Sequence, residues 1–254
     1  MDRDELSRRA HAGHPVAAPV GPGAVDALLG ELTPATGGRV LDLGCGAGEW
    51  LLRLLAGRPD LRGVGVDCSP LALDEARRRA RELGVADRVG WVEGDGASWA
   101  DGDVEVALCI GATHAFGGLS GTLRALRGHL APGGQALLGD GFWERPPSHE
   151  AQAALEAGPD DMPDLPGLVA TAREHGFEVG YGHVSTLEEW DDYEWSWTGS
   201  LVRWALHEAP SEDARNQALE AARTHRDEWL RGYRGELGFA TLVLHPVEAG
   251  VVIA

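Results

Sequence analysis

A glycine bend that follows a short apolar strand constrains this chain more than any other sequence feature. Residues 39–50 read R-V-L-D-L-G-C-G-A-G-E-W, and three glycines form the bend: Gly44, Gly46 and Gly48. Glycine adopts backbone angles that other residues avoid, and its missing side chain lets a ligand come close to the backbone. A helix is expected at 49–56, with its free N-terminal amides facing whatever lies on the bend.

A second apolar strand is expected at 64–66, and it ends in Asp67. In parallel α/β folds, an acid at the carboxyl end of the second strand accepts hydrogen bonds from the hydroxyls of a ribose. The bend and this acid together predict a site for a nucleoside.

The spacing of the glycines argues against two familiar nucleotide motifs. The dinucleotide fingerprint G-x-G-x-x-G needs glycine at the position of Glu49, and a carboxylate at the start of a helix would repel a pyrophosphate. A phosphate-binding Walker loop requires lysine, and the 254-residue chain contains none.

The pattern that remains resembles motif I of the class I S-adenosylmethionine-dependent methyltransferases, D-x-G-x-G-x-G, which begins here at Asp42. Further segments follow in the order of that family and extend the resemblance over residues 36–145. They are a strand at 89–93 followed by G-D-G, a strand at 104–110 followed by G-A-T-H, a helix at 119–130, and P-G-G at 132–134 leading into a strand at 135–138.

The resemblance implies an α/β fold with a Rossmann-like, seven-stranded methyltransferase sheet whose last strand is antiparallel. We expect an N-terminal helical arm over residues 1–35, which in this fold usually folds over the cofactor. The cofactor-binding domain is expected at 36–185 and 237–254, with a helix at 165–175, strand six at 178–184 and strand seven at 238–245. A helical substrate cap is expected as an insertion at 186–236, in two helices at 187–208 and 212–234.

The resemblance also assigns cofactor contacts. S-adenosylmethionine is the expected cofactor and S-adenosylhomocysteine its product. Its methionine portion would lie on Asp42 and the bend, its ribose on Asp67, and its adenine beside Asp95. The expected binding residues are Asp42, Gly44, Cys45, Gly46, Asp67, Cys68, Asp95, Gly96, Ile110 and Gly111.

Catalytic residues are harder to assign, because methyl transfer from a sulfonium needs alignment and a dry site more than it needs a base. His114 follows the fourth strand, where this fold commonly places the group that faces the methyl, and an imidazole can act as a base, so it is our first candidate for contacting the substrate. Asp140, just past the fifth strand, is the second, and Tyr193 is a weaker one. Each of these three residues could instead have a purely structural role, such as helix capping, turn formation or packing. His11 and His14 would act only if the arm closes.

The first expected cap helix carries aromatic residues at spacings of three, four and seven, which predict one aromatic face: Trp190, Tyr193, Trp197 and Trp204. Acidic residues lie between them. The face either packs in the interior or also forms part of the wall of a pocket for an apolar, aromatic or cationic substrate.

Composition narrows the possible partners. The net charge is −18 and every one of the 22 basic residues is arginine, which disfavours nucleic acid as a partner. No apolar stretch approaches a membrane span, and residues 1–5 lack the pattern of a signal peptide, so we expect a cytoplasmic protein with no membrane partner. The three cysteines and ten histidines show no metal-binding spacing, and no metal is expected.

We therefore expect a methyltransferase that acts on oxygen or nitrogen of a small-molecule metabolite. The alternatives are a domain that binds S-adenosylmethionine as a sensor, and an enzyme that uses the cofactor without transferring methyl. The sequence leaves the substrate, the methylated atom and the oligomeric state open.

Overall fold

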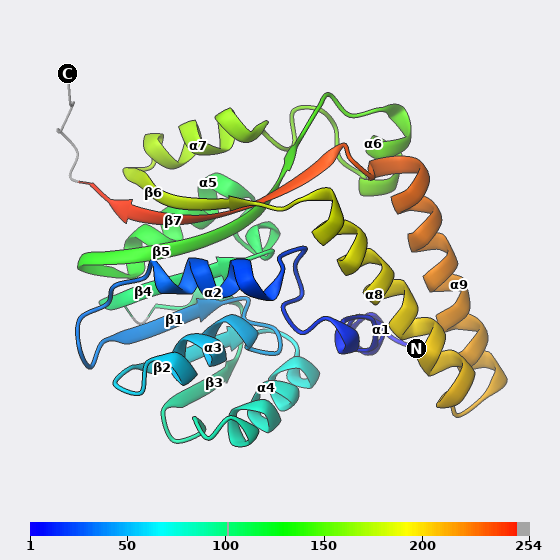
Figure 1. Ribbon diagram of the computed structural model, residues 1–254, viewed down its shortest axis with the longest axis horizontal. Coiled ribbons are helices and arrows are strands. Elements are labelled where there is room, and N and C mark those ends of the chain that lie inside the picture. Colours follow the sequence, from blue (N-terminus) through cyan, green and yellow to red (C-terminus); the bar gives the residue numbers. More distant parts are fainter. Residues whose placement is uncertain (101, 248–254) are drawn as a thin grey trace. The chain divides into compact units, whose positions relative to one another are not determined.

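The computed structural model describes residues 1–100 and 102–247, and its framework is a seven-stranded sheet in the order β3-β2-β1-β4-β5-β7-β6 (Figure 1). Strands β1 to β5 are parallel where they pair, and β7 runs antiparallel to β6. The strands are β1 Arg39–Leu43, β2 Arg62–Asp67, β3 Val89–Glu93, β4 Val104–Ile110, β5 Leu130–Trp143, β6 Phe177–Val184 and β7 Leu237–Pro246. The expected methyltransferase fold is confirmed.

The helices accompany the strands in the alternating order of a doubly wound fold. They are α1 Arg3–Ala10, α2 Pro22–Gly30, α3 Glu49–Gly57, α4 Pro70–Glu82, α5 Leu119–His129, α6 His149–Leu155, α7 Leu165–Glu174, α8 Leu187–His207 and α9 Glu212–Glu228. Short 3₁₀ turns add η1 His11–Gly13, η2 Gly96–Ser98 and η3 Thr113–Phe116, and η4 Trp229–Tyr233 is a π-helix.

Two compact units divide the chain. The sheet unit contains Pro22–Asp140, Leu165–Val184 and the chain from Ala240 onward. The helical unit contains Met1–Gly21, Gly141–Asp164 and Ser185–Phe239.

In the sheet unit, β1 is buried on both faces, as a central parallel strand should be. Val40 and Leu41 are each 1% exposed and Leu43 is fully buried. Helices α2, α3 and α4 form one helical layer, and α5 and α7 pack together as another (Figure 1). This packing fixes the carboxyl end of β1, where the glycine bend begins.

In the helical unit, α8 and α9 pack side by side, and α1 and η1 pack against α8 (Figure 1). Thr186 and Glu189 form a reciprocal capping box that starts α8. Ser211 accepts a hydrogen bond from the Ala214 amide at 3.2 Å and starts α9, as expected.

The structure corrects several expected boundaries. The second cap helix does not continue regularly to residue 234, because α9 ends at Glu228 and the chain widens into the π-helix η4. The fifth strand is longer than the expected 135–138, since β5 runs from Leu130 to Trp143. Part of the expected range 237–254, residues 248–254, lies outside the described residues.

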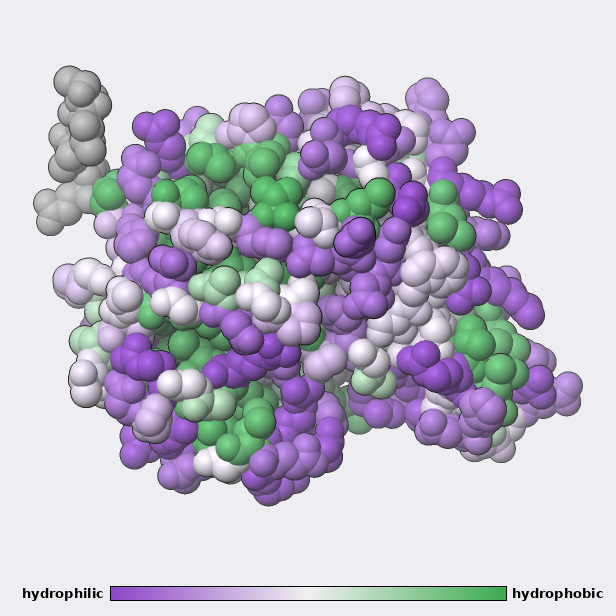
Figure 2. All heavy atoms as spheres, viewed as in Figure 1, coloured by the Kyte–Doolittle hydropathy of each residue, from purple (hydrophilic) through white to green (hydrophobic). Residues whose placement is uncertain are grey.

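No helix among the described residues is both long enough and apolar enough to cross a membrane. On the face shown in Figure 2, hydrophilic side chains cover most of the surface and hydrophobic patches are small and separate, in keeping with the strongly acidic composition.

Candidate functional site

The glycine bend has the geometry that its sequence predicts. Gly44, Gly46 and Gly48 have φ angles of +72°, +52° and +74°, the left-handed region that favours glycine. A Cβ on Gly44 would lie 2.4 Å from the Cβ of Ala112, so packing alone requires glycine there. A Cβ on Gly46 would meet nothing within 4 Å, so this glycine borders open space where a ligand fits.

Asp67 lies directly against the bend. One carboxylate oxygen accepts the Gly46 amide hydrogen at 2.7 Å, and the other accepts that of Ser69 at 2.8 Å. The amides of Gly44 and Cys45 donate to the Val66 carbonyl at 2.9 and 3.1 Å. The acid and the bend therefore form one cradle at the carboxyl ends of β1 and β2.

Asp42 is the buried acid beneath this cradle. Its side chain is 3% exposed. Burial raises the pKa of Asp42 to about 8, with a further rise from the charge of Asp67, while a hydrogen bond from the Leu51 amide opposes the rise. A cation bound nearby would favour the ionised form of Asp42.

The two turns η2 and η3 come together beside the bend. Asp95 caps η2 by accepting hydrogen bonds from the Ala97 amide at 2.9 Å and the Ser98 hydroxyl at 3.1 Å. A Cβ on Gly96 would lie 3.2 Å from the Phe116 ring and 3.7 Å from the Gly44 nitrogen. Phe116, which the sequence analysis did not select, therefore forms an apolar side of the cradle.

The ends of β4 and β5 lie side by side. Ile110 pairs with Gly139, and the Gly111 amide donates to the Gly139 carbonyl at 2.9 Å. Gly111 has a φ of +70°, and a Cβ there would meet nothing within 4 Å, so it too borders open space.

Asp140 follows directly and is held in place by Thr113, whose hydroxyl donates to it at 2.8 Å. His114, in the same turn as Thr113, is exposed. The structure thus places two of the three catalytic candidates on adjacent strand ends of the sheet unit. Tyr193, the third, belongs to α8 of the helical unit.

The cysteines are free thiols. Cys45 lies in the bend, Cys68 is exposed after β2, and Cys109 is buried in β4. Burial raises the pKa of Cys45 and of Cys109, so both stay protonated. Within residues 1–100 and 102–247, no group of three or more potential ligands is placed to hold a metal ion.

Glu49, at the start of α3, is 5% exposed and pairs with two guanidinium groups, Arg53 at 2.6 Å and Arg79. The two guanidinium groups therefore neutralise the negative charge of Glu49. The spacing of the glycines therefore disfavours a dinucleotide more than repulsion by this carboxylate does.

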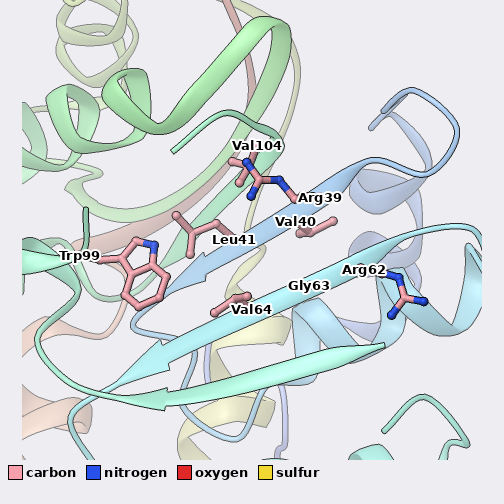
Figure 3. Close-up of a pocket in the computed structure, with 8 residues that line it drawn as sticks. All are labelled: Arg39, Val40, Leu41, Arg62, Gly63, Val64, Trp99 and Val104. Atoms are coloured by element: carbon pink, nitrogen blue, oxygen red, sulfur yellow. The ribbon is translucent and has the colours of Figure 1, made fainter. Parts of the chain in front are cut away.

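A separate hollow in the sheet unit lies over the amino-terminal halves of β1 and β2 (Figure 3). Arg39 and Arg62 begin β1 and β2, and the side chains of Leu41, Val64 and Trp99 make its lining mostly apolar. Ligands of parallel α/β sheets bind at the carboxyl ends of the strands, so this hollow is separate from the predicted nucleoside site.

The cradle fits a sulfonium nucleoside. It offers open space beside Gly46 and Gly111, the Asp67 carboxylate against the bend, and the acids Asp42 and Asp67, which suit a ligand with positive charge on sulfur. Such a cofactor supplies an activated methyl group when it is bound, and the residues of the cradle would hold and orient it.

Comparison with known proteins agrees with this reading. The profile of the family described as "Methyltransferase domain" matches residues 40–134. A SAM-dependent methyltransferase from Geobacter sulfurreducens, solved with S-adenosylhomocysteine, is 31% identical with a TM-score of 0.85, over 95% of this chain and 98% of that one.

Two relatives match most of the sequence. The Escherichia coli (strain K12) protein YjhP is 38% identical over 191 residues, 74% of this chain and 76% of that protein. The 27-O-demethylrifamycin SV methyltransferase of Amycolatopsis mediterranei (strain S699) is 28% identical over 77% of this chain and 70% of that protein. The chain therefore belongs to the class I S-adenosylmethionine-dependent methyltransferases, and S-adenosylmethionine is its cofactor.

Proposed function

We propose that this enzyme methylates oxygen or nitrogen of a small-molecule metabolite and releases S-adenosylhomocysteine. The observation that carries the proposal is the pair formed by Thr113 and Asp140 at the carboxyl ends of β4 and β5. β4 adjoins β1 and β5 is the next strand beyond β4, and neighbouring strands lie roughly 5 Å apart, so Asp140 is about 10 Å across the sheet from the glycine bend.

A fixed carboxylate at that distance suits an acceptor that carries a hydrogen on oxygen or nitrogen. Because the Thr113 hydroxyl occupies one oxygen of Asp140, the carboxylate has a defined orientation. Asp140 would accept a hydrogen bond from the acceptor group and align its lone pair with the methyl carbon. His114, exposed in the neighbouring turn, would pass the released proton to solvent.

The aromatic side chains of the helical unit favour a small-molecule substrate. Its longest helix, α8, has 21 residues, and the predicted aromatic residues of this helix are half-buried or buried, whereas Trp195 outside the predicted face is 50% exposed. We propose that the inserted segment 186–236 supplies the residues that select the substrate. The name of the Amycolatopsis relative, which refers to a 27-O-demethyl compound, favours oxygen as one acceptor atom.

Nucleic acid is a poor candidate for the substrate. The net charge of −18 repels phosphate backbones, whose binding depends on neutralisation by basic residues.

The test is a screen for S-adenosylhomocysteine. Purified enzyme and S-adenosylmethionine are incubated with separate panels of alcohols, phenols, carboxylic acids and amines, and the product is quantified by mass spectrometry. Turnover with members of one panel supports the proposal. Tight cofactor binding without turnover on any panel, or turnover on a protein or nucleic acid instead, would contradict it.

The role of His114 is tested with the active acceptor. We expect His114→Ala to lower kcat while cofactor affinity stays within about twofold, since the side chain would move a proton and not hold the cofactor. His175→Ala, in the sheet unit but after α7, is the matched control. A loss of cofactor affinity with unchanged kcat would make His114 a cofactor residue.

A further inference from the structure

The sheet ends at β6, and no strand of the described chain pairs with the outer edge of β6. Helices of both layers, α2 and α7, contact β6, so its edge is what stays open (Figure 1). Glu178 is exposed in this strand, and Tyr181 and Val184 are 40% and 41% exposed. The backbone groups of an open edge can pair with a strand of another molecule.

The pairing of β6 with β7 determines which backbone groups of β6 point outward. In an antiparallel pair, residues that bond the neighbouring strand alternate with residues whose N–H and C=O point away from it. At one end, the Ser185 amide donates to the Phe239 carbonyl at 2.9 Å. At the other end, the Val247 amide donates to the Gly176 carbonyl, also at 2.9 Å. Counted in steps of two from these bonds, the residues that point outward are Phe177, Val179, Gly182 and Val184.

The outward residues are arranged symmetrically along the strand, because the register of β6 on β7 shifts by one residue between Val179 and Tyr181. A second copy of β6 that runs antiparallel to the first can therefore place Val179 opposite Gly182 and Phe177 opposite Val184. Every outward group of one strand then faces an outward group of the other, and the two register shifts face each other. Two-fold symmetry also requires this antiparallel direction when a strand pairs with its own copy.

The side chains are complementary in the same register. Glu178 lies opposite His183 of the partner subunit, and two-fold symmetry forms this pair twice. A carboxylate accepts a hydrogen bond from an imidazole N–H, whether or not the ring is protonated. Glu178 already lies 3.5 Å from Arg173 of its own chain, but this pair is exposed, so the carboxylate can accept a further bond. Tyr181 lies opposite a glycine, Gly180, which leaves room for its ring.

The other edge of the sheet, β3, does not offer this match. Its five residues read V-G-W-V-E, and Glu93 is the only charged one. No pairing of β3 with its own copy can therefore bring opposite charges together. Between the two edge strands, β6 is the one that is self-complementary.

We propose that β6 is the contact surface of a homodimer, in which two copies of the strand pair antiparallel and join two sheets into one. The occupant of the edge is a second copy of this chain, because one register satisfies all the outward backbone groups and also pairs opposite charges. The interface is short, so we expect a reversible dimer with a Kd in the micromolar range. This inference concerns assembly and does not depend on the proposed acceptor.

Sedimentation velocity of the full chain, from low micromolar to near-millimolar concentration, tests the proposal. We expect the monomer to convert to a dimer as the concentration rises. Val184→Pro removes an outward N–H and no bond to β7, and edge strands accept proline at such positions. It should raise the Kd of the dimer at least about tenfold, because symmetry removes the bond twice. Val184→Thr keeps the N–H and the shape of the side chain, so this matched control should dimerise normally.

Charge variants test the register, and they use sites that are not fully buried in case Val184→Pro does not fold. His183→Glu places carboxylates opposite each other twice and should raise the Kd about tenfold. Adding Glu178→Arg brings opposite charges together again and should return the Kd to within about threefold of the original. Glu82→Arg, exposed at the end of α4, changes the net charge equally and should not rescue His183→Glu.

Three results would overturn the proposal. The first is a protein that stays monomeric at every concentration. The second is a dimer that folded Val184→Pro and His183→Glu both leave intact, since it would use another surface. The third is a His183→Glu defect that Glu82→Arg relieves as well as Glu178→Arg does, because net charge would then explain the rescue.

Discussion

Replacing Asp67 with alanine tests the cofactor cradle directly. This carboxylate holds the backbone of the bend, and we propose that it also binds the ribose of the cofactor. Each of its oxygens accepts a backbone hydrogen, from Gly46 at 2.7 Å and from Ser69 at 2.8 Å. Each oxygen keeps a further lone pair for a ribose hydroxyl. Asp67→Ala would remove the proposed ribose contacts and would also release the bend from the start of α4.

The expected loss follows from the bonds removed. A hydrogen bond to a charged group contributes about 1.5–3 kcal/mol, and water entering the variant site recovers part of it. We expect S-adenosylmethionine to bind about 2 kcal/mol more weakly, roughly a 30-fold rise in Kd. Asp67→Asn should lose about as much, because its NH₂ group would face one of the two backbone N–H donors.

Isothermal titration calorimetry with S-adenosylmethionine and with S-adenosylhomocysteine measures both affinities. Asp74→Ala is the control, since that carboxylate is 73% exposed and pairs with Arg77 on the surface of α4. A change below threefold in a folded Asp67→Ala protein would refute the assignment of the ribose to this residue.

Three further predictions concern Asp42, Glu194 and the pair formed by Thr113 and Asp140. Because the pKa of Asp42 is raised to about 8, the folded protein keeps a proton that the unfolded chain releases above pH 4, so stability falls as pH rises from 4 to 8. Asp42→Asn should flatten that slope in thermal denaturation of the cofactor-free protein, and an unchanged slope would show that Asp42 is not its source. Glu194 is 2% exposed and accepts hydrogen bonds from His225 and Tyr233, both at 2.7 Å, so Glu194→Ala should cost about 3 kcal/mol in urea unfolding. The exposed Glu188→Ala should cost nothing measurable, and equal losses would contradict the role of burial. Thr113→Val should lower kcat and leave the Kd of the cofactor unchanged, because it removes the hydroxyl that donates to Asp140. A fall in cofactor affinity with unchanged kcat would instead indicate that Thr113 helps to bind the cofactor.

The part of the site built by the backbone was predictable from sequence. Glycines at positive φ and the carboxyl ends of adjacent parallel strands follow from local patterns, and these bring Asp67 to the bend. The seven-stranded sheet and its antiparallel last strand followed from the family resemblance, because four motifs occur along the chain in the order of that family.

The side-chain pairs that complete the structure were not predictable. Thr113 holds Asp140 from 27 positions away, and Glu194 holds His225 from 31. Such pairs depend on how helices and strands pack together, and no regular spacing in the sequence indicates them. The π-helix η4 was missed for a related reason: it places Tyr233 on the buried Glu194, a tertiary contact that overrides the regular helical pattern.

We expect a sulfonium nucleoside to lie in the cradle formed by the glycine bend and Asp67. A crystal structure with S-adenosylhomocysteine tests this directly. We expect both ribose hydroxyls within hydrogen-bond distance of the Asp67 carboxylate and the sulfur above Gly44 and Gly46. A nucleoside bound elsewhere, or a ribose that does not contact Asp67, would contradict the account.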